Sequence, residues 1–436
     1  MSNYFGEGMG EMNYSEEIKT WLQKNKSKAI KLLQKLVQER SISGFESSAQ
    51  AVVVEACREI GLEIDIWEPD IKELQTHPNF VSARETFQDS PNVVAIWRGT
   101  GGGQSIILNG HIDVVPEGDL KQWSHDPYEG KVEDGKVFGR GTTDMKGGNV
   151  SLLMAITLLK ELGIRLKGDV IFQSVIEEES GGAGTLATIL RGYKADAVLI
   201  PEPTNMKIFP KQQGSMWFRI YVKGKSAHGG TRYEGVSALE KALTVINTIK
   251  ELEKKRNLRV TDPLFQHIPI PLPINIGKIE GGSWPSSVPD LIKLEGRIGV
   301  GPHETLEEVK EEFRHELSLL SKHDDWFTLH PVRLEWFGAQ WVPGEIEMNH
   351  SFIKVLQNSI EKVRKQMAIL EASPWGTDGG LFSSLMDTPT IIFGPGTTEV
   401  AHFPNEYISI DQMMEAAEII AYLLIEWCGM SDESLQ

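Results

Sequence analysis

The sequence predicts an α/β fold class, in which a mixed, mostly parallel sheet is flanked by helices and carries a smaller inserted α+β domain. Two observations support this prediction. Short apolar runs rich in β-branched residues alternate with helix-like segments in the first half of the chain. Near residue 213 the pattern changes to long alternating strands. Strands that alternate with helices are typical of parallel sheets, whose strands are joined by helical crossovers.

The first half of the chain contains the elements expected of such a sheet. Apolar residues at helical spacing predict helices over 16–38 and 44–60, and another is expected over 149–163. Apolar runs that end in Gly, Asp or Pro predict strands at 93–97, 105–110, 169–176 and 196–200. The polar, aperiodic stretch 70–91 predicts an irregular loop. No internal repeat is present.

The inserted domain is expected over 213–335. The run SMWFRIYVKG alternates like a half-exposed strand, and an amphipathic helix follows it, with an apolar stripe formed by Val236, Leu239, Leu243, Ile246 and Ile249. Further strands and a helix over 306–320 complete the insertion. The α/β pattern then resumes with the strand TIIFG and a closing helix over 411–427. The main domain is therefore predicted to be discontinuous, formed by 1–212 and 336–436.

Composition excludes several classes of protein. The 436 residues carry a formal net charge of −17, which argues against nucleic acid or an anionic membrane as partner. The two cysteines, Cys57 and Cys428, do not suggest a disulfide framework or a CxxC-type site. The opening residues lack the basic start and apolar core of a signal peptide, and no apolar run is long enough to span a membrane. A cytoplasmic location is expected.

The candidate site residues follow the predicted strands. His111 and Asp113 come directly after SIILNG. An imidazole that binds a metal needs a hydrogen-bond partner at its second ring nitrogen. On an extended chain, the side chains of residues two positions apart lie on the same face. Asp113 is thus expected to orient His111. The alternative is a strand-end histidine paired with an aspartate without any metal. Asp144, in GRGTTDMKGG, precedes a predicted helix, where a helix-capping role is the alternative.

Three further segments add carboxylates and a second histidine. Glu177, Glu178 and Glu179 follow a strand, and although such a run is usually a solvated surface, its position favours a site. One carboxylate can bind a cation while its neighbour takes a proton. Glu202 lies in LIPEPT, and His402 lies in a Gly/Pro loop after TIIFG. Two His and several Asp/Glu suit Zn²⁺ or a similar ion, and the set is too large for a single tetrahedral zinc with an open position.

Taken together, these segments resemble a known set of motifs. GHIDVVP, GRGTTDMKGG, EEESGG, PEPT and AHFPNE resemble, in order, the motifs of the M20 family of metallopeptidases and deacylases. GKSAHGG and LEGRIGV match the family as well. The resemblance covers nearly the whole chain. The family includes acetylornithine deacetylase, succinyl-diaminopimelate desuccinylase, aminoacylase and glutamate carboxypeptidase.

The resemblance implies a role for each residue. Two divalent cations are expected, zinc above all, with cobalt or manganese as alternatives. One would be held by His111, Asp144 and Glu202, and the other by Asp144, Glu179 and His402. Glu178 would be the general base, Asp113 would orient His111, and a cis peptide bond would follow Asp144. His228 would stabilise the reaction intermediate from the partner subunit of a homodimer formed through the inserted lid domain, and Arg297 would bind the α-carboxylate of a small-molecule substrate.

Two departures from the family pattern concern the lid and the glutamate run. Ser286 stands where family members usually carry Asn, and Glu177 stands where Asp is usual. The implied activity is hydrolysis of the amide bond of N-acyl amino acids by a metal-activated water. A dipeptidase or carboxypeptidase of the same family is the nearest alternative. A two-metal phosphoesterase and a metal-binding homologue without catalysis are more distant ones.

Overall fold

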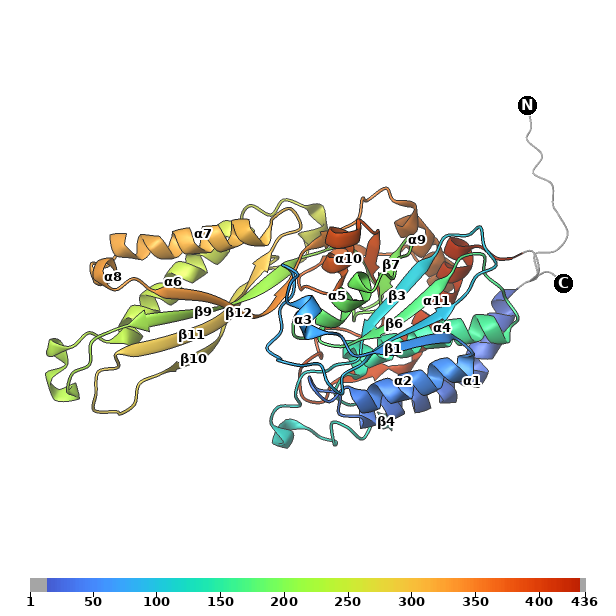
Figure 1. Cartoon of the computed structure of the whole chain (residues 1–436), viewed down its shortest axis with the longest axis horizontal. Coiled ribbons are helices and arrows are strands. Elements are labelled where there is room, and N and C mark those ends of the chain that lie inside the picture. Colours follow the sequence, from blue (N-terminus) through green and yellow to red (C-terminus); the bar gives the residue numbers. More distant parts are fainter. Residues whose placement is uncertain (1–13, 432–436) are drawn as a thin grey trace, which may run out of the picture.

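A computed structural model describes residues 14–431 of the chain. The molecule is elongated, with a large sheet wrapped by helices at one end and a smaller sheet carrying two long helices at the other (Figure 1). The acidic opening stretch, from which no signal peptide is predicted, lies largely outside the described residues. No helix within 14–431 is both long and apolar enough to cross a membrane.

The large sheet has nine strands, and its centre is parallel. β6, β3, β7 and β15 pair in parallel, whereas the strands toward the edges add antiparallel pairs. This mixed sheet flanked by helices confirms the predicted fold class. The strands lie in the order β1 (Glu63–Trp67), β2 (Asn92–Trp97), β6 (Val170–Val175), β3 (Ile106–His111), β7 (Val198–Ile200), β15 (Thr390–Ile392), β8 (Ile208–Gln212) and β13 (Gly344–Glu345), with β14 (Leu370–Ser373) also paired to β8.

Helices cover both faces of this sheet. One apolar core lies under α1 (Tyr14–Gln38), α2 (Ser47–Ile60), α4 (Gly147–Glu161), α9 (Ser351–Arg364) and α11 (Ile410–Cys428). The other face packs against α5 (Ala183–Leu190) and α10 (Gly379–Met386). Because α4 lies between the sheet and its neighbours α1 and α11, its residues 147–159 are all buried. A small sheet of β16 (Tyr407–Ser409), β5 (Lys136–Phe138) and β4 (Lys131–Glu133) lies beside them.

The second sheet is antiparallel throughout. Its order is β10 (Ile274–Gly281), β11 (Leu291–Val300), β9 (Gly214–Lys223) and β12 (Arg333–Trp341). Its core includes residues of α6 (Ala238–Asn257), α7 (Leu306–Ser318) and the short α8 (Trp326–Leu329). β12 continues six residues beyond the predicted boundary at 335, and the division into domains stays a prediction.

Two details of the expected elements are wrong. In the stripe predicted for α6, Ile249 is buried as expected, but Leu239 and Leu243 are exposed, because the buried face also runs through Ala242 and Val245. Strand β1 was not predicted from the sequence, since its short EIDIW run is partly exposed at the edge of the sheet and shows only a weak strand pattern. The loop 70–91 is irregular as expected, apart from one short helix, α3 (Ile71–Leu74).

Candidate metal centre

The predicted ligands lie at one edge of the large sheet. His111 ends β3, the glutamate run follows β6, Glu202 follows β7, and His402 lies in the loop after β15. These four strands are neighbours and run in parallel. Their carboxyl ends therefore meet at the same edge, which is where ligands bind in open α/β sheets.

Two ligand groups meet at Asp144. The His111 Nε2 atom lies 3.1 Å from Asp144 Oδ1 and 3.7 Å from Glu202 Oε1. The His402 Nε2 atom lies 3.3 Å from Asp144 Oδ2 and 3.0 Å from Glu179 Oε1. In each trio the possible ligand atoms lie within 4.8 Å of one another. Asp144 thus offers one oxygen to each trio, and the imidazole and carboxylate donors fit a pair of divalent cations that share a carboxylate.

The electrostatics of these groups favour positive charge. Glu179 raises the pKa of His402 to about 12, with Asp144 adding to the effect. Burial opposes a charge on His111, but its hydrogen bond to Asp144 and the nearby Glu202 outweigh burial and raise its pKa. Burial raises the pKa of Glu202 and that of Glu178 well above the usual range. The carboxylates that raise the pKa of both histidines would stabilise bound cations in the same way.

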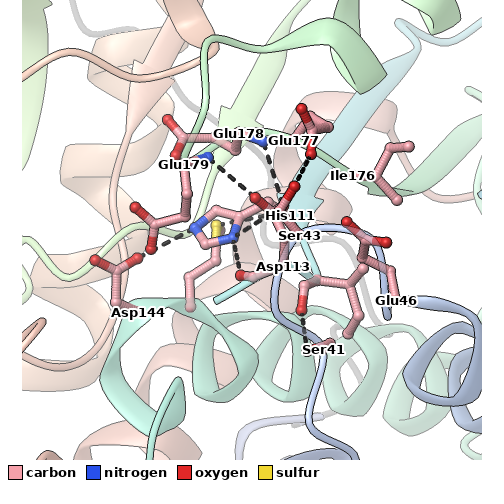
Figure 2. A network of polar contacts seen from close by, with 12 residues as sticks. Ser41, Ser43, Glu46, His111, Asp113, Asp144, Ile176, Glu177, Glu178 and Glu179 are labelled. Atoms are coloured by element: carbon pink, nitrogen blue, oxygen red, sulfur yellow. Dashed lines mark hydrogen bonds and ion pairs between the residues drawn. The ribbon is translucent and has the colours of Figure 1, made fainter. Parts of the chain in front are cut away.

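Asp113 contacts His111 through a different atom from the one expected. The His111 Nδ1 atom lies 2.8 Å from the backbone carbonyl of Asp113 and 3.7 Å from its carboxylate. The carboxylate instead accepts hydrogen bonds from the backbone N–H groups of Glu178 and Glu179, at 3.2 and 3.1 Å (Figure 2). Asp113 therefore holds the histidine and the glutamate run in one place.

The capping role considered for Asp144 is wrong. Helix α4 begins at Gly147, and Asp144 and Met145, joined by a cis peptide bond as the family resemblance implied, have non-helical backbone angles. The Asp144 N–H donates instead to the buried carboxylate of Glu406, at 3.2 Å. Arg140 donates to the other oxygen of Glu406, at 2.7 Å. Neither Glu406 nor Arg140 was predicted from the sequence as a site residue, although Glu406 is the last residue of the AHFPNE motif and Arg140 lies in GRGTTD.

The glutamate run is not a solvated surface. Glu177 is 1% exposed and accepts a hydrogen bond from Ser43 (Figure 2). Ser82 also donates to its carboxylate, and Arg84 lies beside it. Glu178 is also buried. Glu177 therefore has a structural role, and Glu178 faces the cavity described next.

A cavity of about 430 Å³ opens beside the two ligand groups. Its lining includes Glu178, Arg297 and the three tryptophans Trp217, Trp341 and Trp375. Burial lowers the pKa of Arg297 to about 10, and no carboxylate among residues 14–431 contributes to this shift. The tryptophans were not singled out from the sequence, since they lie outside the motifs.

The lid residues lie apart from this cavity. His228 is exposed, is absent from the lining, and accepts a hydrogen bond from the Gly230 N–H at 3.1 Å. The carbonyl of Ser286 accepts from the Gly229 N–H. His228 is therefore not part of the cavity of its own chain.

Comparison with known proteins identifies the family. The model of peptidase family M20/M25/M40 matches residues 107–426, which contain every predicted ligand. The chain belongs to peptidase family M20. As an M20 member it is a metal-dependent hydrolase of amide bonds.

Two sequence relatives match at least three quarters of this M20 chain. It is 32% identical over 445 residues to N-formyl-4-amino-5-aminomethyl-2-methylpyrimidine deformylase of Halalkalibacterium halodurans, covering 97% of this chain and 99% of the relative. It is 28% identical over 340 residues to acetylornithine deacetylase of Proteus mirabilis, covering 76% and 80%. A dinuclear metal-binding M20 peptidase of Bacillus subtilis shares the fold, with a TM-score of 0.63, 18% identity and coverage of 93% and 99%.

Proposed function

We propose that this M20 protein is a two-metal deacylase, which hydrolyses the amide bond of N-acyl amino acids with Glu178 as general base. One observation carries the proposal. Asp144 lies between two His–carboxylate groups, and Glu178 lines the cavity at the same place. The trios correspond to the ligand sets that the family resemblance implied, with zinc as the expected cation.

The chain's own residues supply the proton transfers. Two cations bound at these groups would make water more acidic and polarise the substrate carbonyl. Glu178 takes the proton of the attacking water and later delivers it to the leaving amine. Its burial raises its pKa, which suits a group that must hold a proton between the two steps. Asp113 holds the backbone of Glu178 in place during both transfers.

Arg297 supports an anionic substrate. The guanidinium of Arg297 is half-buried and is suited to binding a free carboxylate through two hydrogen bonds. The amino acid half of an N-acyl amino acid carries such a carboxylate. Arg297 is the only lysine or arginine among the described residues that line the cavity, which argues against a phosphoesterase. A dipeptidase or carboxypeptidase remains the alternative, because its substrates also carry a carboxylate. The names of the two sequence relatives, a deformylase and a deacetylase, favour a deacylase.

Three further expectations belong to this proposal. First, the protein would work as a homodimer in which His228 reaches the partner's cavity. Second, its cations would be zinc, with cobalt or manganese as alternatives. Third, it would act in the cytoplasm. The exposed position of His228 supports the first of these. The acidic charge is compatible with the third.

Glu178→Gln tests the function. We expect this variant to lose turnover of N-formyl and N-acetyl amino acids while binding two zinc ions per chain, since Glu178 belongs to neither trio. Glu347→Gln, on an exposed residue outside the cavity, is the control. Release of the amine is the measurement, and dipeptides and a phosphate ester are run beside the acyl amino acids. An active Glu178→Gln variant would overturn the role of Glu178, and turnover of dipeptides alone would favour the peptidase.

A further inference from the structure

The cavity beside the metal ligands has a wall of tryptophan. Trp217 comes from β9, Trp341 from the end of β12, and Trp375 from the segment after β14. The aliphatic side chains in the lining are small by comparison, namely Val115, Pro203 and Ala401. Trp217 lines the cavity and remains 37% exposed, so part of its ring is accessible to a ligand.

The backbone around Trp217 is shaped to hold its ring. The pairing of β12 with β9 shifts between Trp336 and Gln340, so the strand bulges there. Within the bulge, Gly338 has φ +62°, and a Cβ at this position would lie 2.7 Å from the Trp217 ring. Only glycine therefore leaves room for the indole. Phe337 supports it, with ring centroids 6.0 Å apart. Trp217 is thus a rigid surface rather than a loose side chain.

Trp217 and Trp341 form a corner. Their ring centroids lie 6.5 Å apart, their planes meet at 57°, and both residues line the same cavity. Planar rings bind well in such a corner, in offset or edge-to-face contact. A puckered saturated ring of the same size buries similar area but lacks the specific contact.

Arg297 lies next to this corner. It is the cross-strand partner of Trp217 in the pairing of β11 with β9, and both line the cavity. The same part of the substrate that offers an anion to Arg297 therefore lies against Trp217. A cationic group could also bind to an indole face, but the positive charge of Arg297 disfavours one here.

We propose that the substrate carries a planar aromatic or heteroaromatic ring on its amine half, and that this ring lies in the corner formed by Trp217 and Trp341. The proposal rests on the deacylase function and narrows its substrates to N-acyl amines that bear such a ring. Trp217 then determines specificity and takes no part in the bond cleavage.

A matched pair of substrates tests the ring. N-formyl-phenylalanine and N-formyl-cyclohexylalanine share the carboxylate, the amide and the number of ring carbons, and they differ in planarity. We expect kcat/KM to favour the aromatic compound by about 3- to 10-fold, the range of an aromatic pair. Trp217→Leu should bring this ratio close to one, and Trp217→Phe should keep most of it. Trp326→Leu, a tryptophan outside the cavity, should leave the ratio unchanged.

Binding separates this inference from the proposed function. Phenylalanine and cyclohexylalanine, the amine products that keep the carboxylate, are titrated calorimetrically into the zinc-loaded protein and its Trp217→Leu variant. If no acyl compound is hydrolysed, the deacylase function fails, yet a ratio of dissociation constants of about 3 or more that disappears in Trp217→Leu still supports the ring site. Equal affinities, or a ratio that survives Trp217→Leu, would overturn it.

Discussion

The indole Nε1 of Trp341 donates a hydrogen bond to the backbone carbonyl of Glu178, at 3.1 Å. Trp341 ends the last strand of the second sheet, whereas Glu178 follows a central strand of the first. Gly376 makes this approach possible, because a Cβ there would lie 2.8 Å from the Cβ of Trp341. One tryptophan thus forms a wall of the cavity and also fixes the backbone of the expected general base.

Trp341→Phe should lower kcat more than it changes KM. The variant keeps an aromatic wall but removes the hydrogen bond to Glu178, worth about 1 kcal/mol and hence roughly a fivefold loss in rate. Steady-state kinetics and zinc content of the purified variant provide the measurement. Trp375→Phe is the control, since it changes another indole of the same cavity, and the Glu178 carbonyl accepts its hydrogen bond from Trp341 instead. An unaltered kcat in Trp341→Phe, or an equal loss in the control, would refute the role of this bond.

The number of bound cations should follow the two trios. Replacing Asp144 by Ala removes a ligand from both groups, so we expect occupancy to fall from two zinc ions toward none. His111→Ala and His402→Ala should each weaken the binding of one cation and leave the binding of the other unchanged, because each histidine belongs to a single trio. Metal analysis after dialysis against limiting zinc measures this. Loss of both ions in His402→Ala would contradict the separate trios.

Arg84→Met should destabilise the fold. Arg84 Nη1 lies 3.3 Å from the carboxylates of both Glu46 and Glu177, whose side chains are 0% and 1% exposed. Without it, two buried carboxylates lose their shared cation, and we expect a loss of about 2–4 kcal/mol in the free energy of unfolding. Urea unfolding at fixed zinc concentration is the measurement. Arg314→Met, which breaks an exposed pair with Glu311, should cost less than about 1 kcal/mol.

Mixing two inactive proteins tests the partner histidine. We expect His228→Ala to lose activity, because the proposed function places this histidine at the partner's site. Its zinc content should stay normal, because His228 lies outside both trios and outside the cavity of its own chain. A dimer of one Glu178→Gln chain and one His228→Ala chain would contain one complete site. Refolding the two variants together should therefore restore part of the activity. If the mixture stays inactive although mixed dimers form, His228 does not act across the interface.

The sequence could indicate the candidate ligands because each lies in a short motif next to a strand. His111, Glu179 and Glu202 follow apolar runs, and the parallel order of those runs places them at one edge. The motif resemblance added the division into two trios. The residues that hold the ligands were harder to predict, since Glu406 reaches Asp144 from 262 positions away.

By itself, then, the sequence determined the fold class, the family and the chemistry, since periodicity and local motifs are encoded over a few residues. Tertiary structure decided which atom of Asp113 holds His111, how Glu177 is buried, and where the tryptophans lie. Trp217 and Trp341 belong to strands of one sheet, and Trp341 reaches the backbone of Glu178 only once that sheet packs beside the other. Such contacts depend on packing between distant segments, and no local pattern in the chain records them.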